Sequence, residues 1–248
     1  MIILSILFLI TAILYSSVGF GGGSTYLALL LIWDIPYYIF PVLALICNII
    51  VVSGNSVNYI RSGNLNHKIL IPYLIGSIPL AFLGGSIKIE KGAFEIILFL
   101  VLSFAGFLLL INSNSYKENI IKIREIPNFI SIIIGSILGF LSGVVGIGGG
   151  IFLSPILFLL KAGYPKQIAT AASLFILINS ISGVLGQFTK QNVLNDITSY
   201  WLLFILVFLG GQIGNYLNLK FLSNKLLAII TSGLVLFVAI RIGLKIFT

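Results

Sequence analysis

The stretch Gly19-Phe20-Gly21-Gly22-Gly23 interrupts the apolar sequence in the first half of this chain, and Gly146-Ile147-Gly148-Gly149-Gly150 interrupts the second half. The two glycine clusters begin 127 positions apart, and each follows a long hydrophobic segment and precedes a shorter one. Because lipid offers no hydrogen-bond partners, such breaks are tolerated only inside protein or beside a water-filled cavity. Matching breaks in two matching halves indicate a transport site.

The composition places the chain in a membrane. Of its 248 residues, 59% are hydrophobic and 8% are charged, whereas a soluble domain carries about 25% charged residues. We therefore predict an all-α polytopic membrane protein. The net charge of +8 comes from basic residues scattered over loops. That distribution is typical of loops between membrane helices, and it forms no stripe for nucleic acid.

Apolar runs predict eight helices of membrane-spanning length, over residues 2–18, 37–57, 69–87, 93–111, 128–145, 168–188, 199–219 and 226–246. Two shorter runs, 24–33 and 151–160, follow the glycine clusters. At ~1.5 Å per residue each is about 15 Å long, half of a ~30 Å hydrocarbon core. They are predicted half-helices.

The chain divides into two homologous halves. Residues 1–111 form the predicted first repeat, 112–127 a charged linker and 128–248 the second repeat. Besides the glycine clusters, Leu83-Gly84-Gly85 matches Leu209-Gly210-Gly211 at a shift of 126. The shift between matching motifs stays at 126 or 127 from Gly19 to Gly85, and such a constant shift indicates duplication.

Two topologies remain open. If the half-helices dip in and return, the chain crosses eight times and loop Lys and Arg residues divide eight to six. If they cross, each half has five passes and the division is nine to five. The second arrangement fits the positive-inside rule better. It also makes the halves inverted repeats, because an odd number of passes reverses the second copy.

Three interpretations compete for the glycine clusters. Small residues allow close packing of membrane helices, but packing needs one glycine per turn rather than three in a row. A nucleotide-binding loop would need a preceding strand or a Gly-Lys-Ser/Thr ending, and the sequence has neither. The third interpretation is a broken helix whose free amide N–H groups and dipole attract an anion.

On the third interpretation we predict a substrate site at the breaks. The backbone donors are Gly21, Gly22, Gly23, Gly148, Gly149 and Gly150, and the leading side-chain contacts are Ser24, Thr25, Asn48 and Ser173. Further polar residues on the following helices are candidates for a polar cavity: Ser53, Asn55, Ser56, Asn58, Asn179, Ser180 and Ser182.

The sequence offers little for other chemistry. The single histidine, His67, lies in a polar loop, and the single cysteine, Cys47, lies in an apolar segment. We predict no metal site, no cofactor and no enzymatic activity, because such sites need several partnered side chains. No predicted helix carries a charged residue at its centre. Coupling could therefore use the membrane potential or a sodium site built from carbonyl groups, or be absent.

The motifs resemble those of the sulfite exporter TauE/SafE family of membrane transporters. The resemblance covers nearly the whole chain and rests on the doubled glycine cluster, followed in the second half by Pro155, Gly163-Tyr164-Pro165, Ala169-Thr170-Ala171-Ala172-Ser173-Leu174 and Ser180-Ile181-Ser182-Gly183. The first half adds Tyr59-Ile60-Arg61-Ser62-Gly63 and Ser77-Ile78-Pro79-Leu80-Ala81-Phe82-Leu83-Gly84-Gly85. The resemblance implies a multi-pass carrier of the plasma (inner) membrane for sulfite, sulfonates, other organosulfur anions or some carboxylates.

We therefore predict a secondary transporter for a small anion, with the lipid bilayer as its surroundings. A passive anion channel and a non-transporting membrane scaffold subunit are the alternatives. The particular anion, the direction of transport and the oligomeric state stay open.

Overall fold

The computed structural model describes residues 1–17, 19–112, 123–190 and 197–217, together with positions 233, 236–237, 239–240 and 242–244. In these residues the chain is helical and contains no strand. The helices are α1 (Ile2–Ser16), α2 (Gly23–Ile32), α3 (Phe40–Arg61), α4 (His67–Ser86), α5 (Lys91–Asn112), α6 (Asn128–Val145), α7 (Gly150–Leu159), α8 (Pro165–Gln187) and α10 (Trp201–Leu217), with 3₁₀ turns at Tyr37–Ile39 and Thr198–Tyr200.

Six helical segments in the described part are long and apolar enough to cross a membrane. They are Tyr37–Arg61, His67–Ser86, Lys91–Leu108, Asn128–Val145, Lys166–Gln187 and Thr198–Leu217. The helix predicted over 2–18 has 15 residues, so it is about 22 Å long and shorter than the hydrocarbon core. The helix predicted over 226–246 lies largely outside the described residues.

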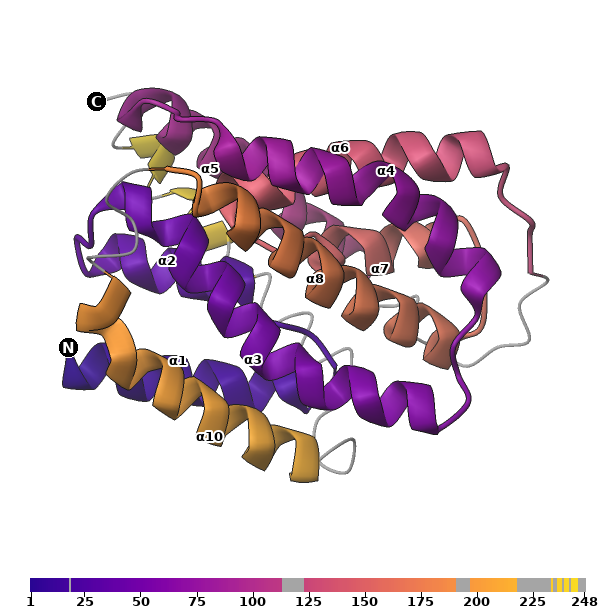
Figure 1. Cartoon of the computed structure of the whole chain (residues 1–248), viewed down its shortest axis with the longest axis horizontal. Helices are drawn as coiled ribbons and strands as arrows, with labels where there is room; N and C mark the ends of the chain where they lie inside the picture. The colour runs from indigo at the N-terminus through magenta and orange to yellow at the C-terminus, as the bar shows by residue number, and fades with distance from the viewer. Residues whose placement is uncertain are drawn as a thin grey trace.

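The predicted half-helices are confirmed. Each of α2 and α7 has 10 residues, and each begins at the last glycine of a cluster. In Figure 1, α2 lies toward one end of the molecule and α7 toward the other.

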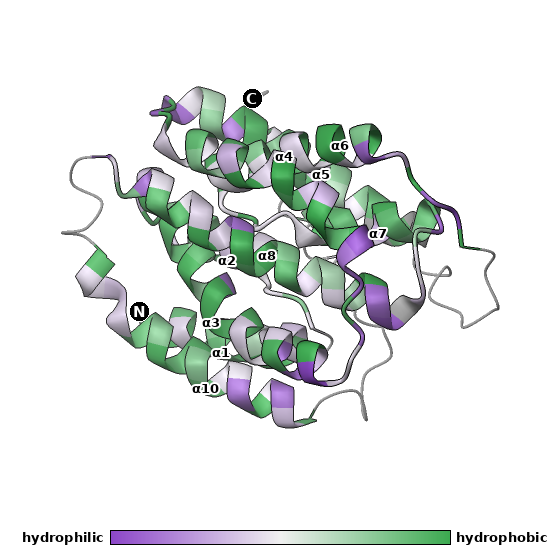
Figure 2. Cartoon of the chain, turned by 45° about the vertical axis from the view of Figure 1, so that its right-hand side comes forward, coloured by the Kyte–Doolittle hydropathy of each residue, from purple (hydrophilic) through white to green (hydrophobic). Residues whose placement is uncertain are grey.

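The polarity of the molecule is reversed relative to that of a soluble protein. Large apolar side chains such as Ile75, Phe129 and Phe208 are more than half exposed, whereas many serine, threonine and asparagine side chains within the helices are buried. Figure 2 shows hydrophobic residues along the helices and hydrophilic residues mainly toward their ends. A multi-pass membrane protein has this distribution, because its exterior contacts lipid.

Glycines set the closest helix contacts. A Cβ atom added to Gly135, Gly139 or Gly143 of α6 would overlap the carbonyl oxygen of Tyr73, Ser77 or Ala81 of α4, respectively. The contact advances by four residues on both helices, so α4 and α6 run parallel.

The same kind of contact joins α1 to α10. Cβ atoms on Gly210 and Gly214 would meet the carbonyl oxygens of Leu9 and Ile13, so these two helices also run parallel. The hydroxyl of Ser16 donates to the carbonyl oxygen of Gly211 at 2.7 Å and closes the far end of this interface.

The matched glycine pairs of the two halves make matched contacts. Gly84 meets Phe140 of α6, and its counterpart Gly210 meets Leu9 of α1. Gly85 meets α8 at Gly183, whereas Gly211 meets α3 at Val51. Helix α4 therefore packs against α6 and α8, and α10 packs against α1 and α3.

The central pair, α3 and α8, runs antiparallel. Leu45 lies near Gly183, and eleven residues further along α3 the hydroxyl of Ser56 lies 3.2 Å from that of Ser173. Since α1 and α3 both run parallel to α10, the chain between α1 and α3 must return toward the end at which α1 began. The segment containing the first glycine cluster and α2 makes this return.

Close packing at α4 and α6 predicts a specific loss of stability. In Gly139→Ala, the new Cβ atom would overlap the backbone of Ser77. Overpacking of this kind destabilises by about 1–3 kcal/mol. We expect a clearly lower unfolding temperature in detergent, measured by intrinsic fluorescence. The matched control is Gly92→Ala, because nothing lies within 4 Å of a Cβ atom there. Equal unfolding temperatures for the two variants would contradict the packing described.

Candidate functional site

Both half-helices begin at a glycine in the left-handed conformation. Gly22 (φ 86°) caps α2, and Gly149 (φ 76°) caps α7. Residues with a Cβ atom disfavour this conformation by roughly 1–2 kcal/mol. Among the described residues no side chain forms a capping hydrogen bond at either start. The Phe152 N–H in the first turn of α7 donates to the Gly149 carbonyl oxygen, and the remaining first-turn amide groups are left to other acceptors, including a ligand.

The two breaks meet inside the molecule. A Cβ atom on Gly23 would lie 2.5 Å from the carbonyl oxygen of Ile147, so the start of α2 touches the backbone of the second cluster. Asn48 of α3 joins them, because its Nδ2 donates to the Ile147 carbonyl oxygen at 3.1 Å. Cβ atoms on Gly21 and Gly148 would both collide with the amide of Asn48. The absence of side chains at these glycines thus makes room for one asparagine.

Helix α8 covers the other side of the breaks. The side chain of Ile176 lies against Gly21, Gly148 and Gly150, and the hydroxyl of Ser180 would be 3.2 Å from a Cβ atom on Gly148. Asn48 and Ser180 therefore flank the same glycine from the two central helices.

Several buried polar atoms near the breaks have no hydrogen-bond partner among the described residues: Ser24 Oγ, Asn48 Oδ1, Asn179 Oδ1 and Ser180 Oγ. Each of these residues is at most 1% exposed. An unsatisfied buried polar group costs about 1–3 kcal/mol. Several such groups around two helix starts are what a polar ligand site requires.

The predicted residues divide into two groups. Gly21, Gly23, Asn48, Gly148 and Gly150 come together, and Ser24 adjoins them with an unpartnered hydroxyl.

Two predicted side chains have partners within the protein. The hydroxyl of Thr25 lies 2.7 Å from that of Tyr15, and that of Ser173 bonds to Ser56. Gly22 packs beside Thr11. Their role in binding substrate stays a prediction.

The structure also places Ile176 and Ser180 at the breaks, and the sequence analysis did not single out Ile176. Ser180 was one of several polar candidates on its helix, and the leading choice there was Ser173. The antiparallel crossing of α3 and α8 places Ser180 beside Gly148. The sequence carries no signal for this register, because both serines lie on the same apolar helix.

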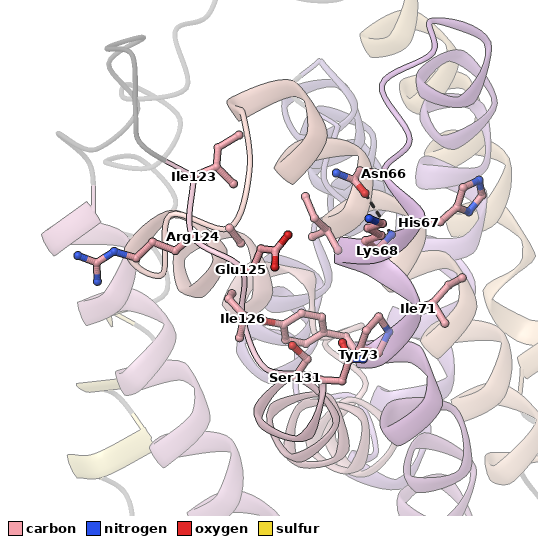
Figure 3. A pocket seen from close by; sticks show the side chains of 14 residues that line it. Asn66, His67, Lys68, Ile71, Tyr73, Ile123, Arg124, Glu125, Ile126 and Ser131 are labelled. Carbon is pink, nitrogen blue, oxygen red and sulfur yellow. Dashed lines mark hydrogen bonds between the residues drawn. The ribbon is translucent and has the colours of Figure 1, made fainter.

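The cluster is closed rather than open to water. Ser24, Asn48, Asn179 and Ser180 are all buried. A cavity of about 570 Å³ lies elsewhere, at the starts of α4 and α6. Figure 3 shows Tyr73 and Ser131 close together there, with Arg124 pointing away. Because Lys68 and Glu125 both line it, this cavity has no uniformly positive surface for an anion.

Basic side chains lie just beyond the end of α8. Lys190 Nζ donates to Gln187 Oε1 at 2.9 Å, and Gln187 Nε2 donates to the carbonyl oxygen of Gly143 at 2.8 Å. Burial, together with the positive charge of Lys88, lowers the pKa of Lys190 to about 8. Two ammonium groups near each other form a positive surface that attracts anions.

The fit around Asn48 predicts how Gly148→Ala behaves. Its Cβ atom would overlap Asn48 Nδ2 (2.7 Å) and Ile176 Cγ2 (3.0 Å) at a φ of +83°. Gly63→Ala is the matched control, because Gly63 has a φ of +71° and nothing within 4 Å. Both variants carry about 1–2 kcal/mol of backbone strain, and only Gly148→Ala also displaces Asn48. We expect it to unfold at the lower temperature. The same unfolding temperature in both would refute this contact.

Comparison with known proteins identifies the relatives of this arrangement. The family described as sulfite exporter TauE/SafE matches residues 4–242. The probable membrane transporter protein y4hK of Sinorhizobium fredii is 28% identical, over 94% of each chain. The probable membrane transporter protein MJ0441 of Methanocaldococcus jannaschii is 31% identical, over 73% of this chain and 70% of that protein.

A third relative is the probable membrane transporter protein YunE of Bacillus subtilis, which is 23% identical over 95% of this chain and 94% of its own. No solved structure matches the chain. The family match extends from α1 to the C-terminal residues and includes both glycine breaks. On this match, the chain belongs to the sulfite exporter TauE/SafE family of multi-pass membrane transporters.

Proposed function

We propose that this protein is a secondary transporter that moves a small anion, such as sulfite or an organosulfonate, across the plasma membrane. The observation that carries the proposal is the meeting of two uncapped helix starts at Asn48. Both helix starts direct amide N–H groups and the positive end of a dipole toward one buried position, which suits a negative ligand.

The two helix dipoles alone are too weak to stabilise a buried anion. A helix dipole contributes about 0.3–2 kcal/mol at each end, whereas burying one ion costs several kcal/mol. Hydroxyl donors must add to the amides. Ser24 and Ser180 have unpartnered hydroxyls in the right region, and the predicted contact Thr25 lies on the first turn of α2.

We also propose that residues 1–111 and 128–248 are inverted repeats joined by the linker 112–127. Supporting this, the counterpart helices α3 and α8 run antiparallel, and the contacts of Gly84 and Gly85 are matched by those of Gly210 and Gly211. Helices α2 and α7 then return the chain in each half, as the ten-pass topology requires. Rocking of one half against the other would expose the breaks alternately to the two sides.

The proposed orientation places the loop between α3 and α4 in the cytoplasm. Arg61, Lys68, Arg124, Lys161 and Lys166 lie at helix ends on that side. The other side has Lys88, Lys91 and Lys190 among the described residues, together with Asp34 and Glu90. The excess of Lys and Arg marks the cytoplasmic face.

The closed state of the cluster favours a carrier over a passive channel. A channel needs a continuous water-filled path, whereas Ser24, Asn48 and Ser180 are buried from solvent. A carrier passes through a closed arrangement between its two open ones.

The proposal is tested with purified protein in proteoliposomes. We expect uptake of ³⁵S-sulfite against its own gradient when a second gradient or a membrane potential supplies energy. In detergent, sulfite should raise the unfolding temperature more than chloride does, because a bound ligand stabilises the native state. Gly148→Ala should lower the uptake rate by about tenfold or more, whereas Gly63→Ala should keep it, since only the first displaces Asn48.

Three results would reject the proposal in different ways. Flux that only follows the electrochemical gradient would assign a channel. Normal uptake by Gly148→Ala would show that the substrate does not bind at the breaks. No thermal shift across sulfite, sulfonates and carboxylates, with no flux, would assign a non-transporting membrane subunit.

A further inference from the structure

The side-chain amide of Asn48 has a defined orientation between the breaks. Its Nδ2 donates to the carbonyl oxygen of Ile147 at 3.1 Å, and its Oδ1 faces Gly21. This Oδ1 is buried and accepts no hydrogen bond from the described residues. A buried acceptor is destabilising unless a donor or a cation meets it. A fully deprotonated anion cannot do so, because its own oxygens are acceptors only.

The closed cluster also lacks positive charge. Lys, Arg and His are absent from 1–60, 126–160 and 167–189, and these ranges contain both breaks and nearly all of α3 and α8. Helix dipoles are weaker than the penalty for burying an ion. An anion enclosed between the breaks therefore requires a positive partner that these three ranges do not supply.

We propose that a monovalent cation of the sodium type binds beside the anion, with Asn48 Oδ1 and Ser180 Oγ as side-chain ligands. This inference rests on the transport function proposed above and names its coupling ion. The two oxygens lie at neighbouring glycines of the breaks: Asn48 Oδ1 faces Gly21, and Ser180 Oγ would be 3.2 Å from a Cβ atom on Gly148. The side chain of Ile176 contacts both of these glycines. Ser180 Oγ has no partner among the described residues, so it is available as a ligand.

The proposed ligands are neutral oxygen atoms, and these favour a monovalent cation over a divalent one. Neutral oxygens from side chains and unwound backbone coordinate Na⁺ in transporters with broken helices. Divalent cations prefer sites that include carboxylates, and the described residues hold no cluster of three or more His, Cys, Asp or Glu side chains. The cation neutralises the anion, while the helix starts of α2 and α7 face the anion itself.

Sodium binding is measured first on the purified full chain in detergent. NaCl is titrated against KCl and choline chloride at constant ionic strength, and the unfolding temperature is recorded. We expect a saturable rise with Na⁺ that choline does not produce. Choline sulfite should then raise the unfolding temperature more when Na⁺ is present, because two ligands that stabilise each other must do so reciprocally.

Transport is measured next, with ³⁵S-sulfite in proteoliposomes. An inward Na⁺ gradient should drive uphill uptake, and replacing Na⁺ by choline should lower the initial rate by about tenfold or more. A pH gradient alone should not replace the Na⁺ gradient.

Variants of Asn48 separate coordination from structure. Asn48→Ala removes the ligand oxygen and should raise the Na⁺ concentration for half-saturation by about tenfold. Asn48→Asp retains an oxygen and adds negative charge, so its Na⁺ response should persist while sulfite binding weakens. The control is Asn64→Ala, because the amide of Asn64 donates to the Ser62 hydroxyl at 2.7 Å in the loop between α3 and α4 rather than at the breaks. Its half-saturation concentration should not change.

The outcomes distinguish this proposal from the proposed function. Sulfite uptake without a Na⁺ requirement, and without a Na⁺-specific thermal shift, overturns the cation site and leaves the anion transporter intact. A Na⁺ shift that Asn48→Ala abolishes, in a protein that neither binds nor moves sulfite, supports the cation site and overturns the anion function. Uptake driven by a pH gradient alone overturns the cation site in favour of a protonated substrate.

Discussion

The central constraint on this structure is that an interrupted helix cannot face lipid. The amide and carbonyl groups released at the two glycine clusters have no water in the hydrocarbon core to replace their lost helical partners. The chain meets this constraint by placing the clusters against each other, so that Gly23 touches the backbone at Ile147 and Asn48 bonds to that carbonyl. Two breaks that would each be unfavourable alone form one buried polar centre.

The surrounding helices explain how this centre stays enclosed. At α4 and α6, glycines let one helix backbone lie directly against the other, and α1 and α10 pack in the same way. Such contacts gain dispersion energy and do not depend on hydrophobic burial, which is weak between helices in lipid. Each of these pairs joins a helix of residues 1–111 to a helix of residues 128–217. The rocking motion that we propose would therefore have to change the packing at these two interfaces.

The polar side chains inside the bundle fall into two groups, those that form hydrogen bonds between helices and those that have no partner in the described residues. Ser16 and Ser56 bond across helix interfaces and hold elements in register. Ser24, Ser180 and the Oδ1 atom of Asn48 are buried without partners in the described residues. A protein interior retains such groups where a ligand supplies the missing interaction. Asn48 Oδ1 and Ser180 Oγ lie at the breaks, which is where we place the anion and its cation. Ser77 and Ser142, on α4 and α6, also have buried hydroxyls without partners in the described residues.

Much of this architecture was predictable from local sequence. The low charge content specified a membrane protein, and three consecutive glycines specified where α2 and α7 begin, because glycine runs disfavour helix and lipid forbids loose backbone. The sequence also singled out Asn48 and the glycines that the structure brings into contact with it, since polar residues are rare in such segments. These features depend on residue type and spacing along one stretch of chain.

The pairing of distant helices could not be predicted in the same way. Asn48 and Ile147 are 99 residues apart, and the choice between Ser173 and Ser180 as the neighbour of Gly148 depends on how α3 crosses α8. Apolar helices of similar composition offer many packing registers of similar energy, and the hydrophobic pattern does not distinguish among them. Which oxygen atoms remain without a partner is settled only after the helices have packed, because every hydrogen bond between helices removes a donor or an acceptor from the site.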